Sequence, residues 1–87
     1  MNITDVKIRA LVNDASRVKA VASITLDGDF AVHDLKVIQG VERLFVAMPN
    51  RRSEDGRFQD IAHPIGQEAR NQIEVAVLDA YREAIKQ

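Results

Sequence analysis

The chain has 87 residues, which favours a single domain near the lower size limit for building its own hydrophobic core. It contains no cysteine, which excludes a disulfide framework and a thiolate metal site and fits a reducing compartment. A net charge of −1 argues against indiscriminate coating of nucleic acid, so any binding to phosphate must come from a local concentration of charge.

The N-terminal region has neither a signal-peptide pattern nor a long apolar run, so the sequence indicates neither secretion nor a membrane span. Alternating apolar residues then predict two strands. The first strand has Val6, Ile8, Ala10 and Val12 on one side, and the same period of two recurs over residues 18–26. Residues 13–16 between them have the composition of a turn, so we expect a hairpin.

A third strand is predicted over residues 30–38, after a two-residue turn at Asp27 and Gly28. Such a turn would place three apolar pairs on one face of the sheet, together with His33. The pairs are Ile24 with Ala31, Ala20 with Leu35, and Val18 with Val37.

The other face of these strands also carries apolar side chains among charged ones. They are Val21, Phe30, Val32 and Ile38. One helix cannot cover both faces of a sheet, and an uncovered apolar patch on a small protein usually marks an interface. We therefore expect a homodimer whose interface contains these four residues.

An unbroken apolar run over residues 44–48 predicts a fourth strand that is covered on both faces, and residues 58–61 suggest a short fifth strand. Pro49 has no N–H to donate to a ladder, and Asp55 with Gly56 gives a turn signal. The segment 49–57 is therefore expected to be an exposed loop, and it carries Arg51 and Arg52.

An amphipathic helix is predicted from Glu68 onward, after His63 and Pro64 break the extended run. Its apolar side repeats at intervals of three and four residues: Ala69, Ile73, Ala76, Val77, Ala80 and Ala84. No repeat or second domain is indicated. Residues 1–87 are thus expected to form one α+β domain, an antiparallel sheet of about five strands followed by one C-terminal helix.

Signals for catalysis or a metal site are weak. His33 and His63, even with Asp34 and Asp60 nearby, lack the spacing of a ligand set, so both histidines are expected to be structural. No serine lies in a nucleophile elbow or a glycine-rich phosphate loop. We therefore expect no metal, no cofactor and no enzymatic activity.

Basic residues gather near the end of the sheet and the start of the helix, namely Arg51, Arg52, Arg57 and Arg70. Paired guanidinium groups can grip phosphate bidentately. Glu54, Asp55 and Glu68 interrupt the patch, and no aromatic stacking platform accompanies it. From the residues alone, these arginines are either a phosphate-binding patch or solvated surface charges.

Several separated motifs resemble the stage V sporulation protein G (SpoVG) family. They are SITLD at 23–27, VHD at 32–34, LFVAMP at 44–49, and Asp60-Ile61 with His63-Pro64-Ile65, in order and with Arg51-Arg52 and Asp55-Gly56 in place. The resemblance covers about residues 4–81. It implies a bacterial, cytoplasmic α+β dimer that binds DNA and RNA and regulates gene expression. In spore formers the family is also tied to septation and cell division, and the family's name refers to sporulation.

Carried over by position, the family's nucleic-acid contacts fall on Arg51 and Arg52 and on the helix start, including Gln67, Arg70 and Asn71. The chain departs from the usual pattern at Gly66, Glu68 and Ala69. The gain of a carboxylate and the loss of a hydroxyl both oppose binding of phosphate. The alternative expectation is a protein-interaction module that acts in division or septation without binding nucleic acid directly.

Overall fold

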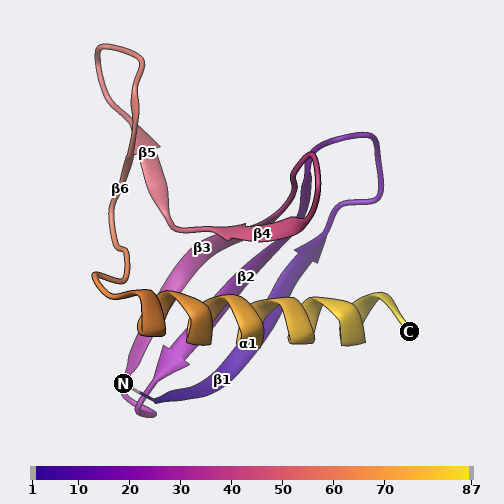
Figure 1. Cartoon of the computed structure of the whole chain (residues 1–87), viewed down its shortest axis with the longest axis vertical. Coiled ribbons are helices and arrows are strands. Elements are labelled where there is room, and N and C mark those ends of the chain that lie inside the picture. The colour runs from indigo at the N-terminus through magenta and orange to yellow at the C-terminus, as the bar shows by residue number, and fades with distance from the viewer. Residues whose placement is uncertain (1, 87) are drawn as a thin grey trace.

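The computed structural model describes residues 2–86, so both terminal residues of the predicted domain lie outside the described part. An antiparallel sheet has the order β1-β2-β3-β4, and two further strands form a separate hairpin (Figure 1). The elements are β1 (Ile3–Leu11), β2 (Val18–Leu26), β3 (Phe30–Gln39), β4 (Leu44–Ala47), β5 (Asn50–Arg52), β6 (Phe58–Asp60) and α1 (Gln67–Ile85). The predicted α+β class is confirmed.

The predicted sheet of about five strands is divided into two sheets. Pro49 is buried directly after β4, although the sequence placed it in an exposed loop. A proline cannot donate a ladder hydrogen bond, so β4 ends there. The following chain pairs with itself, β5 against β6, instead of extending the main sheet.

The turn between β2 and β3 differs from the predicted two-residue turn. Leu26 pairs with Phe30, which leaves the three residues Asp27, Gly28 and Asp29 in the loop. Asp27 and Gly28 have positive φ values of 52° and 69°, conformations that aspartate and glycine tolerate. The predicted register is therefore wrong, and Ile24 lies opposite Val32 rather than Ala31.

A second irregularity lies at Asp34, whose φ is 65°. The pairing shifts between Ile24 with Val32 and Ala22 with Leu35, so β3 has one extra residue here. An extra residue in a strand moves the side chains that follow it to the opposite face. As a result Val32, Leu35 and Val37 all face the core, with Leu35 and Val37 fully buried.

This bulge corrects the predicted dimer surface. Phe30 and Val32 lie on the helix side of the sheet, where they line one pocket with Ile73. Val21 and Ile38 flank buried core residues in their strands and therefore lie on the opposite face. The four residues do not share one face. His33 also changes sides, because its ring bonds to Ser23 on the face away from the core.

The helix crosses one face of the four-stranded sheet, and the hydrophobic core lies between them (Figure 1). Ala20 and Ala22 on β2 are fully buried, and their small side chains let the helix approach closely. The core consists of Ala20, Ala22, Ile24, Leu35, Val37, Val46, Met48, Ile73, Val77 and Leu78. Leu44, Phe45 and Ala47 of β4 are only half-buried in the single chain, so the predicted cover on both faces of that strand stays a prediction that depends on a second copy.

The helix has the predicted apolar side. Ile73 and Val77 are buried, Ala69, Ala76, Ala80 and Ala84 are half-buried, and Leu78 extends the stripe. The helix begins after Gly66, which gives no side-chain cap. Among the described residues, no helix combines the length and apolar character needed to cross a membrane.

Candidate nucleic-acid interface

The hairpin β5–β6 presents the paired arginines. Arg51 lies opposite Gln59 and Arg52 opposite Phe58, and all four residues are exposed. Residues 50–52 of the predicted loop thus form a short strand, and Arg51 and Arg52 are exposed as expected. The Arg52 guanidinium carbon lies 6.0 Å from the centroid of the Phe58 ring, a cation–π contact. An aromatic ring therefore accompanies the arginines, contrary to the expectation from sequence.

Hydrogen bonds order the tip of this hairpin. The Ser53 amide donates to the Arg57 carbonyl at 2.7 Å, and the Gly56 amide donates to the Ser53 carbonyl at 3.0 Å. The Asp55 carboxylate accepts bonds from the Ser53 hydroxyl and, at 3.1 Å, from the Arg57 amide. These hydrogen bonds lower the pKa of the Asp55 carboxyl below its ordinary value of 3.8, and the bond from Ser53 has the largest effect. The tip is therefore held in one conformation around an ionised carboxylate.

The three hairpin arginines differ in their partners. Arg57 lies 3.7 Å from an Asp55 carboxylate oxygen, so its charge is partly compensated. Within the described residues 2–86, Arg51 and Arg52 make no ion pair, and both line a shallow pocket at the hairpin. Arg51 and Arg52 are therefore the guanidinium groups available to an anionic ligand.

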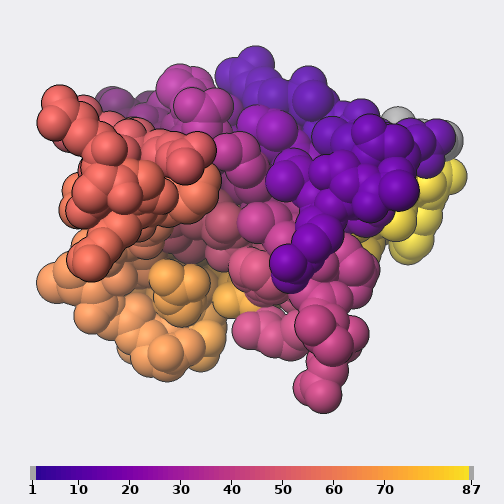
Figure 2. Space-filling view, turned by 90° about the horizontal axis from the view of Figure 1, so that it is seen from above, coloured from indigo at the N-terminus to yellow at the C-terminus, as the bar shows by residue number. Residues whose placement is uncertain are grey.

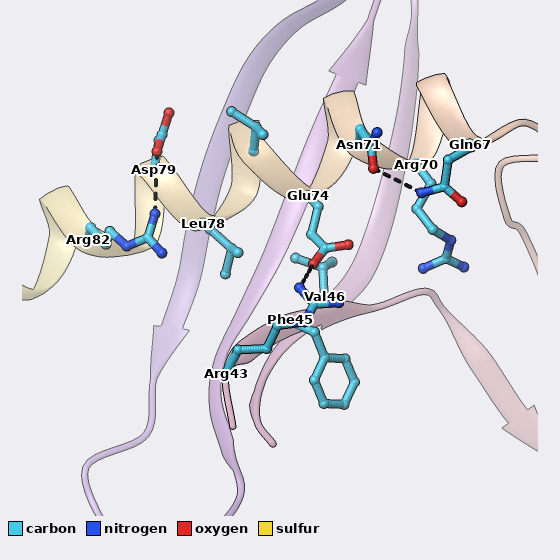
Figure 3. Close-up of a pocket in the computed structure, with 11 residues that line it drawn as sticks. Arg43, Phe45, Val46, Gln67, Arg70, Asn71, Glu74, Leu78, Asp79 and Arg82 are labelled. Carbon is cyan, nitrogen blue, oxygen red and sulfur yellow. Dashed lines mark hydrogen bonds and ion pairs between the residues drawn. The ribbon is translucent and has the colours of Figure 1, made fainter. Parts of the chain in front are cut away.

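A groove of about 740 Å³ lies between β4 and α1, and its helix side extends from Gln67 to Arg82 (Figure 3). Gln67, Arg70 and Asn71 line it from the helix, and Arg43, Phe45 and Val46 line it from the strand side. The amide of Gln67 donates to the Asn71 side-chain oxygen at 2.9 Å. Three of the predicted contact residues thus meet in this groove.

Charges in the groove are mostly paired. A guanidinium nitrogen of Arg43 lies 2.6 Å from a carboxylate oxygen of Glu74, whose side chain is only 16% exposed. Arg82 and Asp79 are 3.6 Å apart. Arg70 makes no ion pair with any residue in the described range. It is the guanidinium that the groove leaves free for a ligand.

Arg43 and Glu74 were not predicted as site residues. They are separated by 31 positions in sequence, and no local pattern signals their contact. Glu68, which we expected to oppose phosphate binding, lines a different pocket from Arg70, together with Asn2, Ile3 and Gln72. Its carboxylate therefore does not line the groove.

The predicted patch is divided between two places. Arg51 and Arg52 line the hairpin pocket, whereas Arg70, Gln67 and Asn71 line the groove. Figure 2 shows the hairpin, in salmon, on the same side of the molecule as the start of the helix, in orange.

Comparisons with known proteins agree on one family. The family model described as SpoVG matches residues 1–83. A septation protein SpoVG from Heliobacterium modesticaldum is 55% identical over 85 residues, which cover 98% of this chain and 94% of that protein. The corresponding protein of Caldanaerobacter subterraneus is 52% identical over 97% of this chain and 91% of its own length. That of Macrococcus caseolyticus is 58% identical over 95% of this chain and 71% of its own length.

Proposed function

The chain belongs to the SpoVG family, and on that premise we propose that it is a nucleic-acid-binding regulator of gene expression that acts in connection with septation and cell division. The observation that carries the proposal is the projecting β5–β6 hairpin with two exposed arginines that lack ion-pair partners in the described residues. Bidentate guanidinium groups on an ordered support suit the phosphate backbone. Phe58 beside Arg52 adds a ring on which a base can stack.

The groove supports the same function at a second point. Arg70 supplies a free charge, and the amides of Gln67 and Asn71 can donate and accept hydrogen bonds. Gly66 leaves the first helix turn without a side-chain cap, so its N–H groups add positive potential near Arg70. A nucleic acid that lies across the hairpin and the groove would contact both arginine sites.

We further propose that the protein works as a homodimer through an apolar surface formed by the start of β3 and the segment between β6 and α1. Phe30 is 64% exposed, Ile61 67% and Ile65 98%. The pocket lined by Phe30, Val32 and Ala62 has a volume of about 200 Å³ and mainly apolar walls. Exposed apolar side chains around an apolar pocket suit contact with a second copy.

The same apolar surface favours the alternative function, a protein-interaction module in septation. The names of the relatives refer to septation, and a division protein could dock on Phe30, Ile61 and Ile65 instead of a second copy. In either case we propose a cytoplasmic protein that works without catalysis or a bound cofactor. Among residues 2–86 there is no group of three or more potential metal ligands.

Binding of fluorescently labelled DNA and RNA, followed by anisotropy across a range of salt concentrations, tests the main proposal. The Arg51→Ala/Arg52→Ala variant should bind every sequence more weakly, and its salt slope should fall by about 0.9 for each duplex phosphate that the variant no longer neutralises. Arg17→Ala/Lys86→Ala removes the same charge from exposed positions elsewhere and should match the parent. If the hairpin variant binds as tightly as the parent at low salt, the interaction module becomes the better proposal.

A further inference from the structure

The face of the main sheet that α1 does not cover carries an unusual concentration of cations. We call it the open face. Within the described residues, α1 is the only element that packs on the sheet from outside it, and it covers the other side (Figure 1). The basic side chains of the open face are Lys7, Arg9, His33 and Lys36.

The register fixes these side chains on the open face. Lys36 lies between the fully buried Leu35 and Val37, so it must point away from the core. Lys7 lies opposite Ser23, and it is flanked by Val6 and Ile8, which pack on the core. Lys7 on β1 and Lys36 on β3 are two strands apart, about 10 Å at ordinary strand spacing.

The charges of the open face are poorly balanced by the protein itself. Neither the lysines of the open face nor Arg9 takes part in an ion pair among residues 2–86. The ion pairs of the described residues lie at the hairpin tip and on the helix. Asp5 is the carboxylate that strand alternation places on this face, and Asp34 lies at the bulge. Three permanent cations, Lys7, Arg9 and Lys36, thus lie on the open face with at most two carboxylates among them.

A hydrogen-bonded cluster holds two of the basic groups in place. Arg9 Nε donates to the Ser23 hydroxyl at 3.3 Å, and the same oxygen lies 2.8 Å from His33 Nδ1. Ser23 is 6% exposed, so Arg9 and His33 are anchored over a buried hydroxyl. Anchored side chains lose less conformational entropy when a ligand binds.

The open face also reaches the proposed groove. Phe45 pairs with Ile38 at the edge of the sheet and lines the groove together with Arg70. A Cβ atom at Gly40 would lie 3.2 Å from the Phe45 ring, so the ring packs closely against that glycine. A chain that crosses the open face can therefore stack a base on Phe45 and continue to Arg70.

From this arrangement we propose that the open face binds single-stranded nucleic acid, which runs over Lys7, Arg9 and Lys36 toward the groove. The inference rests on the proposed function and adds that the nucleic acid is single-stranded. A second copy is a poor occupant, since an isologous contact would set like charges against each other. A duplex groove does not fit either, because four strands span about 14 Å, wider than the roughly 12 Å major groove.

Binding of a labelled thymidine homopolymer and of a mixed-sequence duplex tests the inference. Lys7→Gln/Lys36→Gln should weaken binding of the homopolymer more than of the duplex, and should lower its salt slope by about 1.4, the value for two phosphates of a single strand. Arg17→Gln/Lys86→Gln is the matched control and should bind both ligands like the parent. Lys7→Arg/Lys36→Arg keeps the charge and should restore binding, which excludes a loss caused by misfolding.

Other results would overturn the inference. If the sheet variant binds like the parent while Arg51→Gln/Arg52→Gln binds weakly, the open face is not used but the proposed function stands. If the sheet variant changes only the sedimentation of the protein, the face joins two copies. If polyglutamate competes as well as the homopolymer, the face is a general polyanion surface. If the parent binds no nucleic acid, the proposed function fails as well.

Discussion

Asp34 shows how one backbone conformation redirects a strand. Its φ of 65° belongs to the left-handed region, which aspartate, asparagine and glycine tolerate better than other residues. The resulting bulge moves Leu35 and Val37 into the core and leaves Lys36 on the open face. The composition of both faces of the sheet therefore depends on this residue.

Replacing Asp34 with valine should lower the free energy of unfolding by about 1–2 kcal/mol, because a β-branched residue resists the left-handed conformation. Asp34→Asn and Asp34→Gly are the controls and should stay within about 0.5 kcal/mol of the parent. Urea unfolding followed by circular dichroism gives these values. A valine variant as stable as the parent would mean that the strand has no left-handed residue at this position.

Asp55 makes the order of the hairpin tip depend on pH in the acidic range. The Ser53 hydroxyl and the Arg57 amide lower the pKa of its carboxyl below 3.8. Because this pKa is lower in the folded state, the ionised Asp55 carboxylate stabilises the ordered tip at pH values above 3.8, its ordinary pKa. This stabilisation is lost as the pH falls through the lower pKa of the folded protein. An NMR titration should show the Gly56 and Arg57 amides shifting together with the Asp55 carboxyl. Asp55→Asn should abolish that transition. If the transition persists in the variant, another titrating group causes it.

At the scale of elements, the helix is held by a few apolar side chains rather than by its cap. Gly66 offers no capping side chain, while Ile73, Val77 and Leu78 are buried against the sheet. Most of the stability of a helix in a protein comes from such packing. The hairpin β5–β6 differs, since within the described residues it packs on no other strand or helix.

Ile73 and Ile85 provide a matched pair for testing this view of the helix. Ile73 is 5% exposed and Ile85 is 53% exposed. Ile73→Ala should lower the free energy of unfolding by about 2–5 kcal/mol, because it leaves a cavity in the core. Ile85→Ala removes the same atoms near the surface and should cost about 0.5 kcal/mol or less. Equal decreases in thermal or urea stability would contradict the placement of the helix on the sheet.

At the scale of the whole molecule, the apolar and basic surfaces are separated. The apolar surface around Phe30, Ile61 and Ile65 lies at the start of β3 and the segment between β6 and α1, whereas the open face carries Lys7 and Lys36. We propose self-association for the apolar surface and contact with an anionic polymer for the open face. A dimer through the apolar surface would leave both open faces accessible.

Ile65→Asp should convert the proposed dimer into a monomer, because a carboxylate would be buried in an apolar contact. Ile65 is 98% exposed in the single chain, so the folded monomer should keep its stability. Sedimentation at micromolar concentration distinguishes the two states. Glu42→Ala changes another exposed residue and is the control. A parent protein that sediments as a monomer would refute the dimer itself.

The α+β class, every strand except β5, the apolar side of the helix and the exposure of Arg51 and Arg52 could be predicted from the sequence. Each follows from short-range rules, since alternation, helical periodicity and the missing N–H of Pro49 act over a few residues. The family could also be recognised from motifs in the sequence, and the match of the SpoVG family model over residues 1–83 confirms that assignment.

Which residues come into contact depends on the tertiary structure. The bulge at Asp34 reversed the expected faces of Phe30 and Val32, because a one-residue shift moves a whole strand segment to the other side. The pairing of Arg43 with Glu74 and the separation of Arg70 from Arg51 depend on how the helix lies along β4. Such contacts are fixed by the packing of the core between helix and sheet, and local patterning does not specify them.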